Sequence, residues 1–400
     1  MAKIAFVVPP LTGHINPTLS LGGALIERGH EVVWVSLEES LEQHLPEGGS
    51  VFCLEHDHEE AENEENKRFI ETIKKKAVFG IDSIKYLYEE VLVPLNLYVA
   101  DKIAAFFDQF QPDLVINDHE LFAGAIAAYK KSIPYATSIT APAAIKVMKE
   151  LPKIHEWTEN KIRDLQAACG LELEENITRS NLLNLIFTSH SFFGEDEALP
   201  EHYHFVGPVI RKRPGNVPFD WDSLNATRHP HKIFVSIGTT FDHSEKRDFF
   251  TKVVEAFAGE PVFVIVVSDP DLLESWPENF LVQPKVPQLE LLPHLDAVVC
   301  HAGHNTVCET LNNGLPMVVL PIAYDQQHVA GRVAAIKAGI KLNFKRFKAR
   351  NLKHSIQELL HDSTYRENAK VIRDSFKEAG GTARATVLLE ELLIPSEVHE

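Results

Sequence analysis

Two residues far apart in the chain, His14 and Asp118, have types and positions suited to proton transfer. His14 lies in the stretch PPLTGHINP (9–17), just after the apolar run KIAFVV (3–8), and Asp118 directly follows the run DLVIN (113–117). A histidine oriented by a carboxylate works as a general base, because the carboxylate fixes the tautomer and stabilises the imidazolium that forms. The alternative at this point is that His14 only hydrogen-bonds its own loop and that Asp118 only caps a helix.

A second group of polar residues follows the apolar run AVVC (297–300). Backbone amides at a helix start, with the helix dipole behind them, favour a diphosphate there. Gly303 lets the backbone approach such an anion, and the side chains of His301, Asn305 and Thr306 can donate hydrogen bonds to it.

Three further side chains in this part of the chain suit the hydroxyls of a sugar nucleotide. Glu309 lies one helical turn beyond Thr306 and is expected to reach ribose hydroxyls, whereas Asp325 and Gln326 offer an acceptor and a donor for sugar hydroxyls. As structure alone, His301 and Glu309 would be a capping pair and Asp325 a turn residue.

The elements that must position these residues alternate between short apolar runs and helical stretches, which predicts a doubly wound parallel sheet. Asn16 is expected to cap a helix that begins at Pro17. The run 113–117 is the fourth strand, which in this topology lies beside the first. His14 and Asp118 should therefore meet in the crevice beyond the carboxyl ends of these strands. The expected strands of the first half are 3–8, 31–36, 51–54, 113–117, 134–139 and 185–189.

The pattern restarts after a stretch rich in proline and glycine, VGPVIRKRPGNVPFDW (206–221). We therefore expect two similar α/β domains, at 1–210 and 231–380, joined by a linker at 211–230. A helix at 381–400 is expected to pack back toward the first domain. The expected strands of the second half are 232–238, 262–268, 297–300 and 317–320.

Composition narrows the class of protein. The chain has 400 residues, 44% of them hydrophobic, and a formal net charge of −18, which disfavours nucleic acid as a partner. No apolar run is long enough to span a bilayer and the four cysteines form no CxxC pair, so we expect a cytoplasmic protein without stable membrane insertion. The acidic stretch EHDHEEAENEE (55–65) has no fixed ligand spacing and is interpreted as a solvated loop rather than a metal site.

The second group of residues resembles the donor-binding signature of the family 1 UDP-glycosyltransferases, which have the GT-B fold. The family pattern of Pro-Gln, His-x-Gly-x-Asn-Ser/Thr-x-x-Glu and Asp-Gln is met by Pro287-Gln288, by His301 through Glu309 and by Asp325-Gln326. The stretches GHINP and PDLVIND match the family's catalytic base and its carboxylate partner. The stretch SIGTT (236–240) matches the turn that meets the donor phosphates.

This resemblance implies two Rossmann-like domains facing a central cleft, an acceptor-binding one followed by a nucleotide-sugar-binding one. It implies an inverting transferase that moves a sugar, glucose from UDP-glucose, to a hydroxyl of a hydrophobic small molecule, with His14 and Asp118 as the catalytic pair. No metal and no cofactor are expected besides the UDP-sugar co-substrate, and the protein should be a monomer or homodimer. The donor is expected to contact Ser236, Gly238, Thr239, Val286, Gln288, His301, Gly303, Asn305, Thr306, Glu309, Asp325 and Gln326.

Two positions depart from the family pattern. Lys285 replaces an aromatic residue that stacks on uracil in many relatives, so the base is expected to be held otherwise, by the Val286 backbone. His304 stands where plant members often have tryptophan, which favours a bacterial-type member similar to macrolide and carotenoid glycosyltransferases. The alternatives are an epimerase of the same architecture, which would not need the His14–Asp118 pair, and a non-catalytic UDP-sugar-binding protein.

Overall fold

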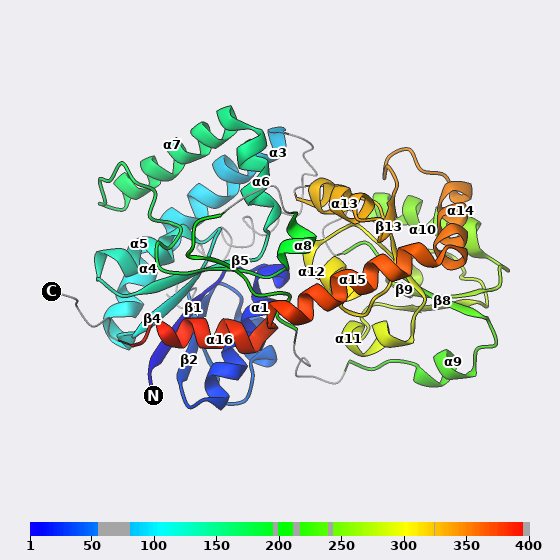
Figure 1. Ribbon diagram of the computed structural model, residues 1–400, viewed down its shortest axis with the longest axis horizontal. Helices are drawn as coiled ribbons and strands as arrows, with labels where there is room; N and C mark the ends of the chain where they lie inside the picture. Colours follow the sequence, from blue (N-terminus) through cyan, green and yellow to red (C-terminus); the bar gives the residue numbers. More distant parts are fainter. Residues whose placement is uncertain (55–80, 195–198, 211–216, 239–242, 324, 395–400) are drawn as a thin grey trace. The chain divides into compact units, whose positions relative to one another are not determined.

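The computed structural model describes residues 1–54, 81–194, 199–210, 217–238, 243–323 and 325–394 (Figure 1). The chain forms two compact units, the first made of Met1–Pro214 and Phe376–Glu400 and the second of Gly215–Ser375. The chain leaves the second unit inside helix α15 (Ser363–Ala379), five residues before the expected bound at 380. Phe376 already belongs to the first unit, where its ring packs against Phe192.

The first unit is built on a seven-stranded sheet in the order β3-β2-β1-β4-β5-β6-β7, with every neighbouring pair parallel. β4 lies beside β1, as expected for the fourth strand. The strands are β1 (Lys3–Val7), β2 (Glu31–Ser36), β3 (Ser50–Cys53), β4 (Leu114–Asp118), β5 (Tyr135–Ile139), β6 (Asn184–Ile186) and β7 (Tyr203–Phe205).

Helices cover both faces of this sheet, which explains why its central strands β4 and β5 are buried throughout. They are α1 (Thr12–Glu27), α3 (Ile81–Tyr86), α4 (Val93–Phe110), α5 (Phe122–Lys130), α6 (Ala143–Glu150), α7 (Pro152–Ala168), α8 (His190–Phe193) and α16 (Gly381–Glu391). A 3-10 helix, η1 (Glu39–His44), and a π-helical segment, η2 (Leu87–Leu92), also belong to the described part of this unit.

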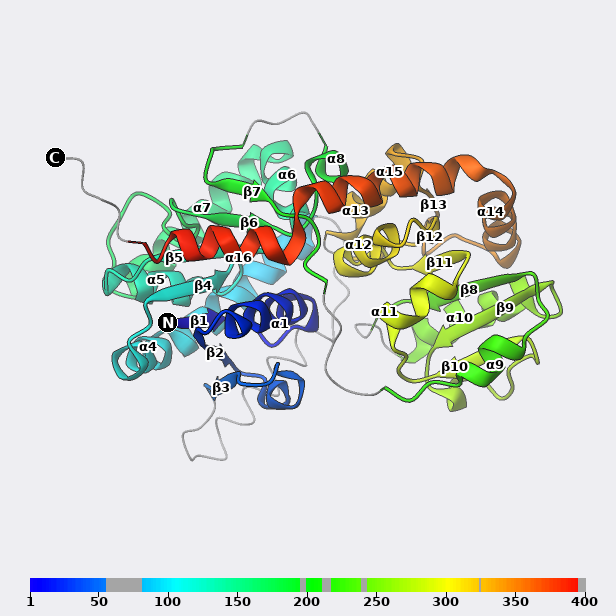
Figure 2. The same ribbon diagram turned by 60° about the horizontal axis from the view of Figure 1, so that its bottom comes forward.

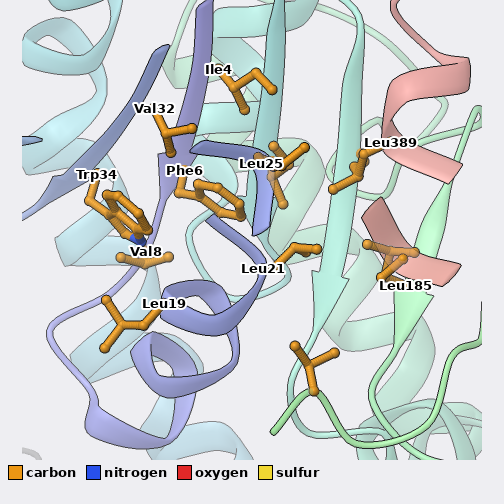
Figure 3. Close-up of a cluster of buried hydrophobic side chains, with 14 of the residues drawn as sticks. Ile4, Phe6, Val8, Leu19, Leu21, Leu25, Val32, Trp34, Leu185 and Leu389 are labelled. Carbon is orange, nitrogen blue, oxygen red and sulfur yellow. The ribbon is translucent and has the colours of Figure 1, made fainter. Parts of the chain in front are cut away.

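One face of the sheet carries the core shown in Figure 3. Phe6 of β1 and Trp34 of β2 stack with ring centroids 5.4 Å apart, and Leu21 and Leu25 of α1 lie on the same face. Leu389 of α16 is completely buried in this cluster, and Figure 2 shows α16 beside α1. The core of the first unit is therefore completed by residues that follow the whole second unit in sequence.

The opposite face is covered by α4 and α5. Ala5 and Val7 of β1 point to this face, where they meet Ile103 and Phe107 of α4. Because successive side chains of a strand alternate between faces, Ile4 and Phe6 bury on one side and Ala5 and Val7 on the other.

The second unit repeats the plan with a six-stranded parallel sheet in the order β10-β9-β8-β11-β12-β13. Its core packs the aromatic residues Phe249, Phe250 and Phe257 of one helix against Val235 and Val264. The strands are β8 (His231–Ser236), β9 (Val262–Val267), β10 (Phe280–Gln283), β11 (Ala297–Cys300), β12 (Met317–Val319) and β13 (Gly339–Lys341). The helices are α9 (Trp221–Ala226), α10 (His243–Phe257), α11 (Gln288–Leu291), α12 (His304–Asn312), α13 (Gln326–Ala335), α14 (Ala349–His361) and the first part of α15, with 3-10 helices η3 (Pro270–Leu272) and η4 (Leu292–His294).

The sequence-based expectation for the first helix is wrong at its start. α1 begins at Thr12, its N-cap position is Leu11, and Pro17 lies inside the helix rather than at its first position. A proline at that point removes only the hydrogen bond that an N–H of residue 17 would give to the Gly13 carbonyl, and packing of the apolar face of α1 compensates for it. His14 consequently lies within the first turn of α1 rather than in a loop before it.

Three strands were not predicted: β7, β10 and β13. Each has three or four residues, and each lies at or next to an edge of its sheet. Such short runs carry too few alternations to be distinguished from loops by periodicity. Among the helices of the described residues, none combines the length and the apolar character needed to cross a membrane.

Candidate active site

His14 is positioned by the start of helix α1. Its backbone N–H donates to the Leu11 carbonyl at 2.9 Å, which anchors the first turn directly after β1. The side chain is 14% exposed, so one edge of the ring reaches solvent.

Asp118 is the last residue of β4, at the same edge of the sheet as the end of β1. Val7 of β1 lies opposite Asn117 in the parallel register, so Asp118 and the start of α1 are neighbours. His14 Nδ1 lies 3.0 Å from both carboxylate oxygens of Asp118. An ionised carboxylate only accepts, so Nδ1 carries the proton toward Asp118 and Nε2 is the proton-accepting nitrogen of the neutral ring.

The carboxyl group of Asp118 is completely buried. Burial alone would raise its pKa, but the charge of His14 and the hydrogen bonds from His14 and from the Glu120 backbone N–H outweigh it and lower the pKa below its ordinary value. Asp118 therefore keeps its negative charge next to the ring of His14.

Thr140 is a third member of the cluster that sequence reasoning missed. It directly follows β5, and its hydroxyl lies 2.8 Å from His14 Nδ1 and donates to Asp118 Oδ2 at 3.2 Å. The rule that singled out Asp118, a polar residue just beyond a strand's carboxyl end, would have found Thr140 if it had been applied to the next strand.

His119 and Glu120 extend the cluster and were also missed. The ring of His119 stacks on that of His14 with centroids 5.5 Å apart and planes 8° apart, and its Nδ1 lies 3.5 Å from Asp118 Oδ1. Burial lowers the pKa of His119 to about 4, so this second imidazole is neutral at neutral pH. Glu120 approaches the outward nitrogen of His14, with Oε2 3.6 Å from Nε2.

His14, Asp118 and His119 also form the one group of three potential metal ligands among the described residues, with their ligand atoms within 4.8 Å of one another. An ion held by both imidazoles would have to lie in the plane of both rings, and two stacked, nearly parallel rings have no such common point. The geometry of the group favours the hydrogen-bonded arrangement over coordination.

In the second unit, neighbouring strands bring the predicted donor-binding residues to one edge of the sheet. Ser236 of β8 lies opposite Cys300 of β11, so Ser236 and His301 are adjacent. Gly238 and Gly303 both lie against the imidazole of His301: a Cβ atom would be 2.9 Å from Cε1 at the first position and 2.7 Å from Nε2 at the second. Any larger side chain would displace the ring, which explains both glycines. Between His301 and Gly303, Ala302 adopts φ +66°, a conformation that costs a non-glycine residue free energy.

Burial lowers the pKa of His301 to about 4, although a backbone hydrogen bond with Ser236 acts in the opposite direction. His301 is therefore a neutral imidazole at neutral pH. Asn305 and Thr306 are the second and third residues of α12, whose N-cap position is Gly303, and both are partly exposed. This helix start fits the predicted anion site.

Glu309, expected to reach the ribose, is joined to Gln288, another residue expected to contact the donor. Gln288 Nε2 donates to Glu309 Oε2 at 2.6 Å, although the two residues are 21 positions apart. The carbonyl of Val286, expected to help hold the base, accepts the backbone N–H of Gln288 at 2.9 Å.

Gln326 has a structural contact that the sequence did not predict. Its Oε1 accepts the backbone N–H groups of Ile322 and Ala323 at 2.9 and 3.0 Å, which closes the loop after β12. Only its amide N–H₂ is therefore left to donate to a sugar, whereas Asp325, at the N-cap position of α13, supplies carboxylate oxygens. Thr239 and the acidic stretch 55–65 lie outside the described residues.

Comparisons with known proteins agree with this arrangement. Residues 225–378 match the family model described as UDP-glucoronosyl and UDP-glucosyl transferase. The chain is 28% identical over 412 residues to the NDP-glycosyltransferase YjiC of Bacillus subtilis (strain 168), covering 99% of both chains. It is also 28% identical to the demethyllactenocin mycarosyltransferase of Streptomyces fradiae, covering 99% of this chain and 87% of that protein.

A solved structure gives the fold. The glycosyltransferase VinC, whose crystal structure is in complex with DTDP, superposes with a TM-score of 0.75 at 18% identity, over 98% of this chain and 99% of that one. The chain is thus a glycosyltransferase with the GT-B fold, and its resemblance to the family 1 UDP-glycosyltransferases is confirmed.

Proposed function

We propose that the protein transfers glucose from UDP-glucose to a hydroxyl group of a hydrophobic natural product, with inversion at the anomeric carbon. The observation that carries this proposal is the buried Asp118 carboxylate, which lies 3.0 Å from Nδ1 of a partly exposed His14. The reaction needs such a base to take the proton from the hydroxyl group that receives the sugar. The names of the relatives, among them a mycarosyltransferase, support a natural product as acceptor.

In the proposed reaction, Nε2 of His14 takes the proton of the acceptor hydroxyl as its oxygen attacks the anomeric carbon. The bond from that carbon to the diphosphate oxygen breaks, and UDP leaves with the electron pair. Attack from the face opposite the diphosphate inverts the configuration. Asp118 stabilises the imidazolium, and Thr140 holds the carboxylate in place through its hydroxyl.

On the donor side, the diphosphate is proposed to lie at the start of α12, against Gly303, Asn305 and Thr306. Amides and neutral donors stabilise the charge that grows on the leaving group without needing a metal ion. His301, Ser236, Gly238 and Thr239 are assigned to the same diphosphate.

The nucleoside and sugar are assigned to the remaining residues. Glu309 is proposed to accept from ribose hydroxyls, with Gln288 and the Val286 backbone toward the base. Asp325 and the amide N–H₂ of Gln326 are proposed to read the sugar hydroxyls. Lys285 stands where an aromatic ring would stack on uracil, so the choice between uridine and thymidine diphosphate is part of the test.

The test is a nucleotide-release assay with UDP-glucose, UDP-galactose and TDP-glucose against macrolides, flavonoids and carotenols, followed by NMR of the product's anomeric proton. We expect UDP release only when donor and acceptor are both present, and a product of inverted configuration. A retained configuration would exclude the direct displacement by a hydroxyl. We expect EDTA to leave the rate unchanged, because no metal ion takes part in the proposed reaction.

The epimerase alternative receives no support, since neither the family model nor the relatives reported above is an epimerase. Interconversion of UDP-glucose with its epimers in the absence of an acceptor would restore it.

A further inference from the structure

We propose that Glu120 makes the active site select acceptors with a second hydroxyl on the atom next to the reacting one, such as catechols and vicinal diols. This inference rests on the proposed function, because it concerns the acceptor of the same reaction.

Glu120 is fixed close to the base by the backbone that holds Asp118. Its own N–H donates to Asp118 Oδ1 at 3.0 Å, and its carboxylate reaches back so that Oε2 lies 3.6 Å from Nε2 of His14. The other oxygen, Oε1, lies 3.9 Å from Nε2 of His119.

Exposure separates this cluster into an inner and an outer part. The side chains of Asp118 and His119 are 0% and 4% exposed, whereas those of His14 and Glu120 are 14% and 17% exposed. The outer part therefore consists of one imidazole and one carboxylate side by side.

The spacing of these two groups limits what an acceptor can present. A hydroxyl oxygen must come within about 3 Å of Nε2 to give up its proton. A hydroxyl that approaches Nε2 from the side of Glu120 also lies next to the carboxylate, because Oε2 is only 3.6 Å from Nε2. A hydroxyl group has one proton, and this proton goes to His14. The hydroxyl oxygen is then left with lone pairs only. It faces a carboxylate that can accept hydrogen bonds but cannot donate one, so the two repel each other.

A second hydroxyl on the adjacent atom resolves this conflict. It donates to Glu120 while the first hydroxyl donates to His14, and hydrogen bonds to an ionised group are among the stronger ones. An ammonium group in the same place would put a positive charge beside the imidazolium that forms on His14. We therefore assign a hydroxyl rather than an amine.

The experiment compares three acceptors of similar size: catechol, 2-methoxyphenol and phenol. Only catechol carries the second donor, and 2-methoxyphenol keeps the adjacent oxygen without its proton. The kcat/KM for each acceptor is measured with the wild type, Glu120→Gln and Glu120→Ala at saturating donor. The ratio between two acceptors is independent of the fraction of folded protein, so partial misfolding of a variant does not affect it.

We expect the wild type to prefer catechol over 2-methoxyphenol by ~10–100-fold, the range for one hydrogen bond to a charged group. Glu120→Ala should bring this ratio close to one. Glu120→Gln, which keeps a carbonyl acceptor without the charge, should retain part of it.

Two results would overturn the inference without touching the proposed function. The first is a wild type that transfers to all three acceptors without preference. The second is an equal loss for all three in Glu120→Ala with the ratio kept, which would mean that Glu120 acts only on His14. A wild type that releases UDP with none of the three, nor with the broader acceptor panel, would contradict the proposed function itself.

Discussion

His119 and His301 occupy equivalent places in the two units. Each lies just beyond the strand next to the unit's first strand, β4 beside β1 and β11 beside β8. His119 is buried and His301 is half-buried, and burial lowers the pKa of both imidazoles to about 4. The surroundings of the two rings differ. His119 lies beside the carboxylate of Asp118, whereas His301 lies against Gly238 and Gly303.

The difference shows how one scaffold supports two kinds of chemistry. In the first unit a buried negative charge is held next to His14, which suits a group that must become positively charged. In the second unit, Gly238 and Gly303 have no side chain, so the backbone lines the site. Among the described residues, no carboxylate contributes to the pKa shift of His301. A helix start lined by backbone amides suits an anion.

The largest expected effect comes from removing the base. His14→Ala should lower kcat on aliphatic alcohols by ~10²–10⁴-fold, the usual range for a general base, because the acceptor proton has nowhere to go. UDP affinity, measured by calorimetry, should stay within a few-fold, since UDP is assigned to the second unit. Wild-type turnover of an alcohol by this variant would remove His14 from the mechanism.

Asp118→Asn tests the buried charge with little change of shape. We expect a fall in kcat of ~10²-fold or more, because the amide neither supports the imidazolium nor enforces the tautomer. Donor affinity should hardly change, and saturation kinetics in the donor separate the two quantities. A collapse of donor affinity with kcat preserved would instead assign Asp118 to the donor.

The two neutral histidines should make the protein sensitive to acid. Their pKa values are lowered in the folded state, so the unfolded chain binds more protons between about pH 6.5 and pH 4, and stability is lost as the pH falls through that range. A shift of this size corresponds to ~3 kcal/mol per histidine. Urea unfolding at pH 7.5, 5.5 and 4.5 measures the loss, and His119→Phe should reduce its pH dependence. An unchanged pH dependence in that variant would mean that His119 does not titrate in this range.

A carboxylate placed at the proposed diphosphate site of the second unit tests the difference between the two units directly. Asn305→Asp puts a negative charge in the first turn of α12. There the charge interacts favourably with the helix dipole, which stabilises the helix, but it repels a diphosphate. We expect UDP affinity to fall by ~10²-fold while the melting temperature stays equal or rises. Asn305→Ala is the control for loss of the side chain alone. Equal affinities for the two variants would argue against a diphosphate at this helix start.

The smallest effect concerns the choice of sugar. Asp325→Ala should lose ~1–3 kcal/mol of transition-state binding for UDP-glucose and less for UDP-galactose, because an equatorial 4-hydroxyl suits the Asp325–Gln326 pair better than an axial one. Glu309→Ala should weaken both donors alike, since its assigned partner is the ribose. The kcat/KM values for both donors decide between these roles. Equal losses for the two donors in Asp325→Ala would mean that Asp325 does not recognise the sugar's 4-hydroxyl.

Residues at strand ends were the part of the site that the sequence predicted best. The position of Asp118 follows from its place after an apolar run and from the rule that the fourth strand lies beside the first. The first helix was predicted to begin too late because Asn16 and Pro17 suggested a local boundary, whereas the backbone N–H groups of His14 and Ile15 already donate to the Leu11 carbonyl.

Contacts between side chains could not be predicted from strand order. The hydrogen bonds of Thr140 and the Gln288–Glu309 pair depend on the spacing of the strands and helices that carry these residues, and one sequence does not contain that spacing. Gln326 shows the same limit, since its contact with the loop after β12 uses the amide oxygen and only the N–H₂ group is assigned to the sugar.

The position of α16 in the chain bears on how the protein is made. Leu389 is needed to fill the core over Phe6 and Trp34, and Glu390 accepts hydrogen bonds from Arg28 and from His30 at 2.7 and 3.1 Å. During synthesis these residues leave the ribosome only after the whole of Gly215–Ser375. The later unit can therefore close its core first, while the core of the earlier one stays incomplete until translation has passed α16.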